Sequence, residues 1–95
     1  MTDRIDDRIQ AAINLGEVEE SEQVEDLLSE GYARALRLDA DRIDLERQIT
    51  TLAARADDAA AANALRRTWL RHRTVVADLR ELRGLLRRLK SLQQV

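Results

Sequence analysis

Apolar residues recur along the chain at intervals of three and four positions, the spacing that places side chains on one face of an α-helix. Residues 1–15 contain isoleucines at four-residue steps, so we expect a short amphipathic helix of about three turns there. A helix this short is marginal in water on its own, and it must therefore pack against another surface. The three isoleucines are Ile5, Ile9 and Ile13.

A second helix is predicted over residues 17–56, which carry a heptad pattern typical of a coiled coil. Beside the core positions of the heptad lies a further apolar stripe, so the apolar face is wider than a helix with one neighbour needs. This stripe consists of Tyr32, Leu36 and Ile43. Gly31 and Arg42 interrupt the two core positions of the heptad, which are otherwise aliphatic. The first core position holds Val24, Leu38, Leu45 and Leu52, and the second holds Leu28, Ala35, Ile49 and Ala56.

A third helix is predicted over residues 59–92, and a turn is expected near residues 56–59, where Asp57 or Asp58 can cap the helix that follows. The alternative is one continuous helix of about 75 residues, because the turn contains neither Gly nor Pro. The apolar residues of the third helix again follow a period near seven, which favours a supercoiled pair. They are Leu65, Trp69, Val76, Leu79, Leu82, Leu86 and Leu89.

Charge predicts the direction in which the two long helices pair. Residues 17–30 hold seven acidic and no basic side chains, whereas residues 80–90 hold five basic side chains and one acidic. A reversal at the turn places these two blocks side by side, where they complement each other. The sequence therefore predicts an all-α fold, an antiparallel two-helix coiled-coil hairpin with a short N-terminal helix, forming a single domain over residues 1–95.

Composition narrows the chemistry that the chain can carry. Its 95 residues include no cysteine and a single histidine, so a disulfide framework or a structural zinc site is not expected. No motif indicates a catalytic site, and we expect no cofactor, no metal and no enzymatic activity. The chain shows neither a membrane-length apolar run nor a secretory signal, which leads us to expect a cytoplasmic protein without a membrane partner.

Two kinds of binding surface remain as candidates. The first is apolar and would take up a protein partner, a second copy of the chain, or both, through helix–helix packing; its residues are Ile5, Ile9, Ile13, Tyr32, Leu36 and Ile43. The second is basic and would contact nucleic-acid phosphates; its residues are Arg66, Arg67, Arg71 and Arg73. We expect His72 to line the core or its edge, and the stem of Arg42 to lie at the helix interface with its charged head in solvent.

The heptapeptide Asp41-Arg42-Ile43-Asp44-Leu45-Glu46-Arg47, together with the predicted hairpin, resembles the helical anti-sigma factors of actinobacteria that bind cyclic di-GMP. The resemblance covers one helix and implies a regulatory hairpin that binds a transcription factor. That family places Glu, Ser, Arg and Gln at set intervals before the last Asp. This chain instead has Ser29, Ala33, Leu36 and Ala40, so nucleotide binding is not carried over.

A second resemblance concerns the helical chorismate mutases, whose first helix contains similar short motifs. Leu36-Arg37, Ile43-Asp44 and Ala53-Ala54-Arg55 are similar to them. Only 40 residues follow Arg55, and they do not divide into the two further helices that this enzyme needs. A small helical enzyme is therefore the least favoured interpretation.

Overall fold

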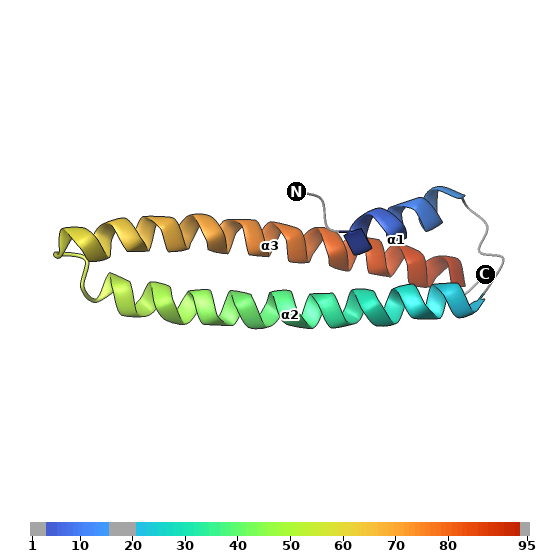
Figure 1. Ribbon diagram of the computed structural model, residues 1–95, viewed down its shortest axis with the longest axis horizontal. Helices are drawn as coiled ribbons and strands as arrows, with labels where there is room; N and C mark the ends of the chain where they lie inside the picture. The colour runs from blue at the N-terminus through green and yellow to red at the C-terminus, as the bar shows by residue number, and fades with distance from the viewer. Residues whose placement is uncertain (1–3, 16–20, 94–95) are drawn as a thin grey trace. The chain divides into compact units, whose positions relative to one another are not determined.

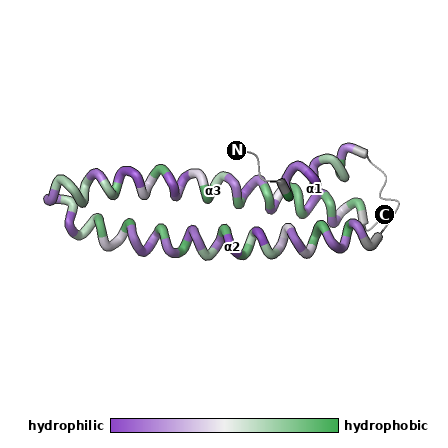
Figure 2. Tube along the Cα trace, in the orientation of Figure 1, coloured by the Kyte–Doolittle hydropathy of each residue, from purple (hydrophilic) through white to green (hydrophobic). Residues whose placement is uncertain are grey.

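The computed structural model describes residues 4–15 and 21–93, and every regular element in these ranges is an α-helix (Figure 1). Helix α1 spans Arg4–Leu15, α2 spans Ser21–Ala53 and α3 spans Ala59–Gln93. The predicted all-α class is thus confirmed. Hydrophobic residues recur between hydrophilic ones along each helix (Figure 2). None of the described helices is long and apolar enough to cross a membrane.

The turn between α2 and α3 begins earlier than predicted. Helix α2 ends at Ala53, after which backbone amides donate to carbonyls three positions back, as Arg55 does to Leu52 at 3.0 Å and Ala56 to Ala53 at 3.3 Å. Such bonds tighten the chain into a turn and end the α-helix. Ala56 was predicted as a core position and is instead exposed in this turn. The predicted limits at residues 1–3 and at 17 lie outside the described residues.

Asp58 caps the N-terminus of α3, as predicted. Its Oδ1 accepts a hydrogen bond from the backbone amide of Ala60 at 2.9 Å, and its carbonyl accepts the first helical bond, from Ala62, also at 2.9 Å. A side-chain oxygen that satisfies an otherwise unpaired amide favours the start of a helix at that residue. The two long helices are therefore separate elements, and the alternative of one continuous helix was wrong.

The chain divides into two compact units, each described here by itself. Unit 1 comprises Met1–Leu36 and Arg80–Val95, and unit 2 comprises Arg37–Leu79. The formation of a single domain by residues 1–95 stays a prediction.

Unit 1 combines α1 with the first part of α2 and the last part of α3. The most deeply buried side chains of unit 1 come from all three segments. Helix α1 therefore packs against other segments of its own chain. This burial supplies the stability that a helix of 12 residues lacks alone. The buried apolar residues are Ile5, Ile9, Val24, Leu27, Ala35, Leu82, Leu85, Leu86 and Leu89.

Gly31 lies at a point where all three segments meet. A β-carbon at this position would overlap Cδ2 of Leu86 on α3 and would lie 3.3 Å from Cδ1 of Ile9 on α1. Both neighbours are buried, with 2% and 0% of their surface exposed, so neither has free space to move into. Glycine is therefore required here for its lack of a side chain, which explains the interruption of the heptad.

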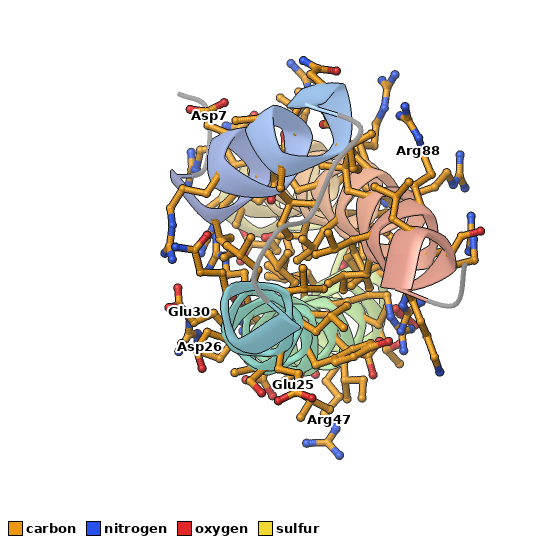
Figure 3. All side chains as sticks on the ribbon, turned by 90° about the vertical axis from the view of Figure 1, so that its right-hand side faces the viewer. Asp7, Glu25, Asp26, Glu30, Arg47 and Arg88 are labelled. Carbon is orange, nitrogen blue, oxygen red and sulfur yellow. The ribbon has the colours of Figure 1, made fainter. Side chains whose placement is uncertain are left out.

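Charged side chains cover the outside of unit 1. Asp7, Glu25 and Arg88 point away from the packed interior (Figure 3). Arg8 of α1 donates from Nη1 to Oε2 of Glu30 on α2 at 2.5 Å, but both side chains are about half exposed. An ion pair in that setting contributes only ~0–1 kcal/mol, so it orients α1 more than it holds it in place.

Unit 2 contains only two helical segments, residues 37–53 of α2 and 59–79 of α3, and it buries fewer side chains. Leu38, Leu45 and Leu79 are its large buried residues, and Ala61 adds a small one. Buried Thr68 satisfies its hydroxyl by donating to the carbonyl of Ala64 at 2.8 Å. With two segments instead of three, much of the apolar surface of this unit stays at the edge of the core.

Substituting alanine at the two described helical glycines tests the packing at residue 31. Gly31→Ala is expected to lower the free energy of unfolding, because overpacking a filled core costs about 1–3 kcal/mol and outweighs a helix-propensity gain of about 0.5–1 kcal/mol. Gly84→Ala is the matched control. Its β-carbon meets only Nη2 of Arg87, at 3.9 Å, and the variant should be more stable than the wild type by about that propensity gain. Urea unfolding followed by circular dichroism measures both, and equal stabilisation by the two substitutions would contradict the close approach.

Candidate interaction surface

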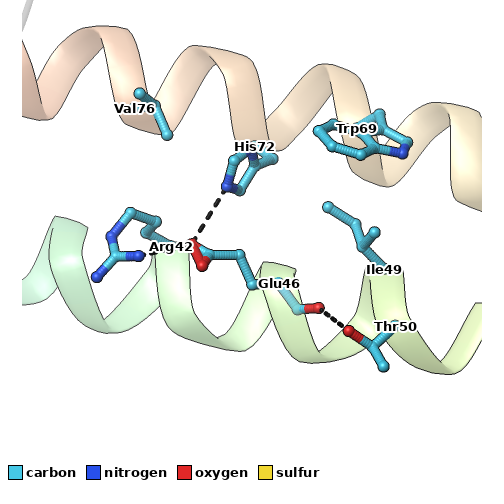
Figure 4. Close-up of a pocket in the computed structure, with 7 residues that line it drawn as sticks. All are labelled: Arg42, Glu46, Ile49, Thr50, Trp69, His72 and Val76. Atoms are coloured by element: carbon cyan, nitrogen blue, oxygen red, sulfur yellow. Dashed lines mark hydrogen bonds and ion pairs between the residues drawn. The ribbon is translucent and has the colours of Figure 1, made fainter.

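A chain of polar side chains joins α2 to α3 within unit 2 (Figure 4). Arg42 donates from Nε to Oδ1 of Asp39 at 2.9 Å and from Nη1 to Oε2 of Glu46 at 2.6 Å. The same Glu46 oxygen lies 3.3 Å from Nε2 of His72 on α3. Because Asp39 and Glu46 lie three and four positions from Arg42, helical spacing alone places the three side chains together.

These hydrogen bonds stabilise the charged forms of Glu46 and Arg42. The hydrogen bond with His72, and after it the one with Arg42, lowers the pKa of the Glu46 carboxyl below its ordinary value of 4.5. The hydrogen bond to Asp39, followed by the one to Glu46, raises the pKa of the Arg42 guanidinium. Arg42 thus holds its charged head at the edge of the core between two carboxylates. All of these charges are partly open to water, which limits what they contribute to stability.

Trp69 stands beside this chain, and its ring meets the ring of His72 edge to face, with centroids 5.6 Å apart and planes at 85°. The indole was predicted at a core position and is instead 48% exposed. It forms part of an open groove on unit 2, with a volume of about 540 Å³, which is shallow rather than enclosed. The groove is lined by Arg42, Glu46, Ile49, Thr50, Trp69, His72 and Val76 (Figure 4).

Three large apolar side chains of unit 2 are exposed, namely Ile43 at 39%, Trp69 at 48% and Leu70 at 57%. Only Ile43 was predicted as a binding residue. Leu70 was missed because it lies outside the three- and four-residue steps of its helix. Its position directly after Trp69 was the available signal, since adjacent large apolar residues cannot both lie at the centre of one narrow stripe.

The predicted apolar residues of unit 1 fall into two groups. Ile5 and Ile9 are buried and Ile13 is partly buried, so α1 directs its isoleucines into its own unit. Tyr32 and Leu36, one helical turn apart on α2, are exposed, and Leu36 keeps 72% of its surface. Only this second group offers a partner substantial apolar surface.

The four arginines predicted to contact nucleic acid are all exposed on α3, and none of them forms an ion pair with another residue in the described ranges. They do not form one patch, however. Arg66 and Arg73 lie three and four positions from Trp69 and therefore share its side of the helix. Arg67 and Arg71 lie two positions from Trp69 in either direction, about 200° around the helix, on the opposite side.

Comparison with protein-family models, curated proteins and solved structures found no match to this chain.

The lowered pKa of Glu46 gives its contribution to stability a defined pH dependence. A carboxyl whose pKa is lower in the folded than in the unfolded chain adds stability above its ordinary pKa, and this is lost as the pH falls through the lowered value. Glu46→Gln should therefore destabilise the protein near neutral pH, and its difference from the wild type should shrink as the pH falls below about 4.5.

Thermal unfolding at a series of pH values between 7 and 3 measures this difference. In a His72→Gln background the pH dependence of the Glu46→Gln effect should become weaker, because the largest cause of the pKa shift is gone. A difference that stays constant with pH, or is unchanged by the loss of His72, would disprove the coupling.

Proposed function

We propose that the chain is a small protein-interaction module, a regulatory adaptor that binds a protein partner or a second copy through helix–helix packing. One observation carries this proposal: large apolar side chains lie exposed in clusters. Single exposed apolar residues are ordinary on a protein surface. Here, however, Tyr32 and Leu36 are one turn apart on α2, and Trp69 and Leu70 are adjacent on α3.

The free energies of apolar burial and of association indicate how much surface a partner has to cover. Burying one large apolar side chain contributes about 1.5–3 kcal/mol, so a pair such as Tyr32 and Leu36 supplies roughly 3–6 kcal/mol at most. Association itself costs about 4–15 kcal/mol in lost freedom of motion. A partner must therefore cover further residues besides such a pair. An extended helix laid along the surface does so more readily than a short loop.

The proposal includes an antiparallel coiled-coil pairing of α2 and α3. Its support comes from two contacts, each inside one unit. The position of Gly31 adjoins Leu86, and Glu46 adjoins His72. The residue number on α3 falls as the number on α2 rises, which is the order that an antiparallel pair requires.

The regulatory role rests on the resemblance of residues 41–47 to helical anti-sigma factors. We place the protein in the cytoplasm, where its cysteine-free composition suits a reducing environment.

Aspartate substitutions at exposed apolar positions test the proposed function. Leu36→Asp and Ile43→Asp should each reduce partner capture or self-association by about tenfold or more, because a charge would be buried at the interface. Gln48→Asp introduces the same charge at an exposed residue of α2 that lies about 120° or more around the helix from both positions, and it should have little effect. Affinity capture from native cytosol, followed by mass measurement of the complex, compares the variants. Unchanged capture by both variants, with helicity intact, would refute the proposal.

Nucleic-acid binding is the second candidate function, and the lack of ion-pair partners for Arg66, Arg67, Arg71 and Arg73 within the described ranges is the observation that favours it. Because two of these arginines face the opposite side of α3 from the other two, one duplex meets two of them, and two phosphate contacts predict an affinity that falls about tenfold between 50 and 200 mM salt. Fluorescence anisotropy with labelled duplex DNA and RNA at these two salt concentrations measures the slope. No binding at the lower concentration would eliminate this candidate.

A further inference from the structure

The groove on unit 2 combines apolar side chains with nearly balanced charges. Ile49, Trp69 and Val76 supply its apolar side chains. Its polar members are engaged with one another, since Glu46 accepts from Arg42 and lies within 3.3 Å of His72. A ligand entering this groove therefore gains apolar contact without having to separate an unpaired charge from water.

The α3 edge of the groove, in contrast, carries one sign of charge. Arg66 and Arg73 lie one turn before and one turn after Trp69 on its side of the helix, and both are exposed without an ion-pair partner among the residues described. Leu70, 57% exposed, lies next to Trp69. The edge thus presents an aromatic and an aliphatic side chain between two free guanidinium groups. Trp and Arg are also the residue types most enriched among the strongest contributors to protein–protein binding.

The chemistry of this edge selects among occupants. A second copy docked face to face would oppose arginine with arginine, which is unfavourable. A nucleic acid would use the two arginines and the indole but would leave the aliphatic surface of Leu70 without an apolar partner. A membrane needs more exposed apolar area than Trp69 and Leu70 provide, since Val76, two turns further along this side of α3, is only partly exposed.

We propose that the unit 2 groove binds an acidic amphipathic helix of a partner protein. The apolar face of this partner helix packs on Ile49, Trp69 and Val76, and the carboxylates of the partner helix pair with Arg66 and Arg73. This inference rests on the proposed function and specifies the chemistry of the partner. Arginine forms bidentate pairs with carboxylates, so it fixes the position of the partner helix as well as attracting it.

Trp69 supplies the measurement, because it is the only tryptophan of the chain and lies in the groove itself. The probes are two tryptophan-free helical peptides of about 18 residues, or five turns. Both carry leucine at three- and four-residue steps, and their other positions hold either glutamate and glutamine or lysine and glutamine. The full-length protein is titrated with each peptide at low salt while Trp69 emission is recorded.

The glutamate peptide should shift Trp69 emission to shorter wavelength in a saturable way, and the lysine peptide should bind at least about tenfold more weakly. Arg66→Glu/Arg73→Glu should abolish or invert this preference. Arg67→Glu/Arg71→Glu makes the same change of net charge on the opposite side of α3 and should leave the preference in place. This control separates recognition at the groove from general attraction to a positive helix.

Three results would overturn the inference: no saturable shift with the glutamate peptide, equal binding of both peptides, or equal sensitivity to the two double substitutions. Duplex DNA or anionic phosphatidylglycerol vesicles that shift Trp69 emission through Arg66 and Arg73, when the glutamate peptide does not, would assign the edge to another class of ligand. If the glutamate peptide does not bind but partner capture is still reduced by Leu36→Asp, this site alone is refuted. If the peptide does not bind and Leu36→Asp leaves capture unchanged, the proposed function is refuted as well.

Discussion

The close approach of helices at Gly31 is the constraint on which the structure of unit 1 depends. A residue without a side chain on α2 lets Leu86 of α3 and Ile9 of α1 reach the same point, so one position joins three segments. Helix α1 is too short to persist alone, and it exists because its isoleucines become buried there. A β-carbon at residue 31 would force the side chain of Leu86 to shift within a filled core.

Unit 2 lacks a third segment, and its proposed role in binding follows from that difference. Two helices bury Leu38, Leu45 and Leu79 between them but leave Trp69 and Leu70 about half exposed. The polar chain around Glu46 joins the two helices at the edge of the core, where apolar packing is thin. A partner helix would provide for unit 2 what α1 provides for unit 1, namely a third apolar surface that completes the packing.

Sequence periodicity predicted which apolar residues share one face of a helix, but it did not predict what covers that face. The heptad correctly placed Val24, Leu38 and Leu45 in the core, and the capping rule correctly predicted an aspartate cap for α3, leaving Asp57 and Asp58 as the candidates, of which Asp58 is the cap. The exposed edge around Trp69 was missed, because one sequence does not say whether an apolar stripe meets its own chain or solvent. For the same reason Ile5 and Ile9 were proposed as partner-binding residues, although α1 buries them in unit 1.

The proposed antiparallel pairing of α2 and α3 is tested most directly by a distance between spin labels, which the absence of native cysteine makes straightforward. Ala33→Cys and Glu81→Cys place one label on an exposed position of each helix. Pulsed electron paramagnetic resonance should give a separation below about 30 Å, because packed helix axes lie only ~8–10 Å apart. A distribution centred near 70 Å, roughly the length of a straight helix between these positions, would contradict the pairing.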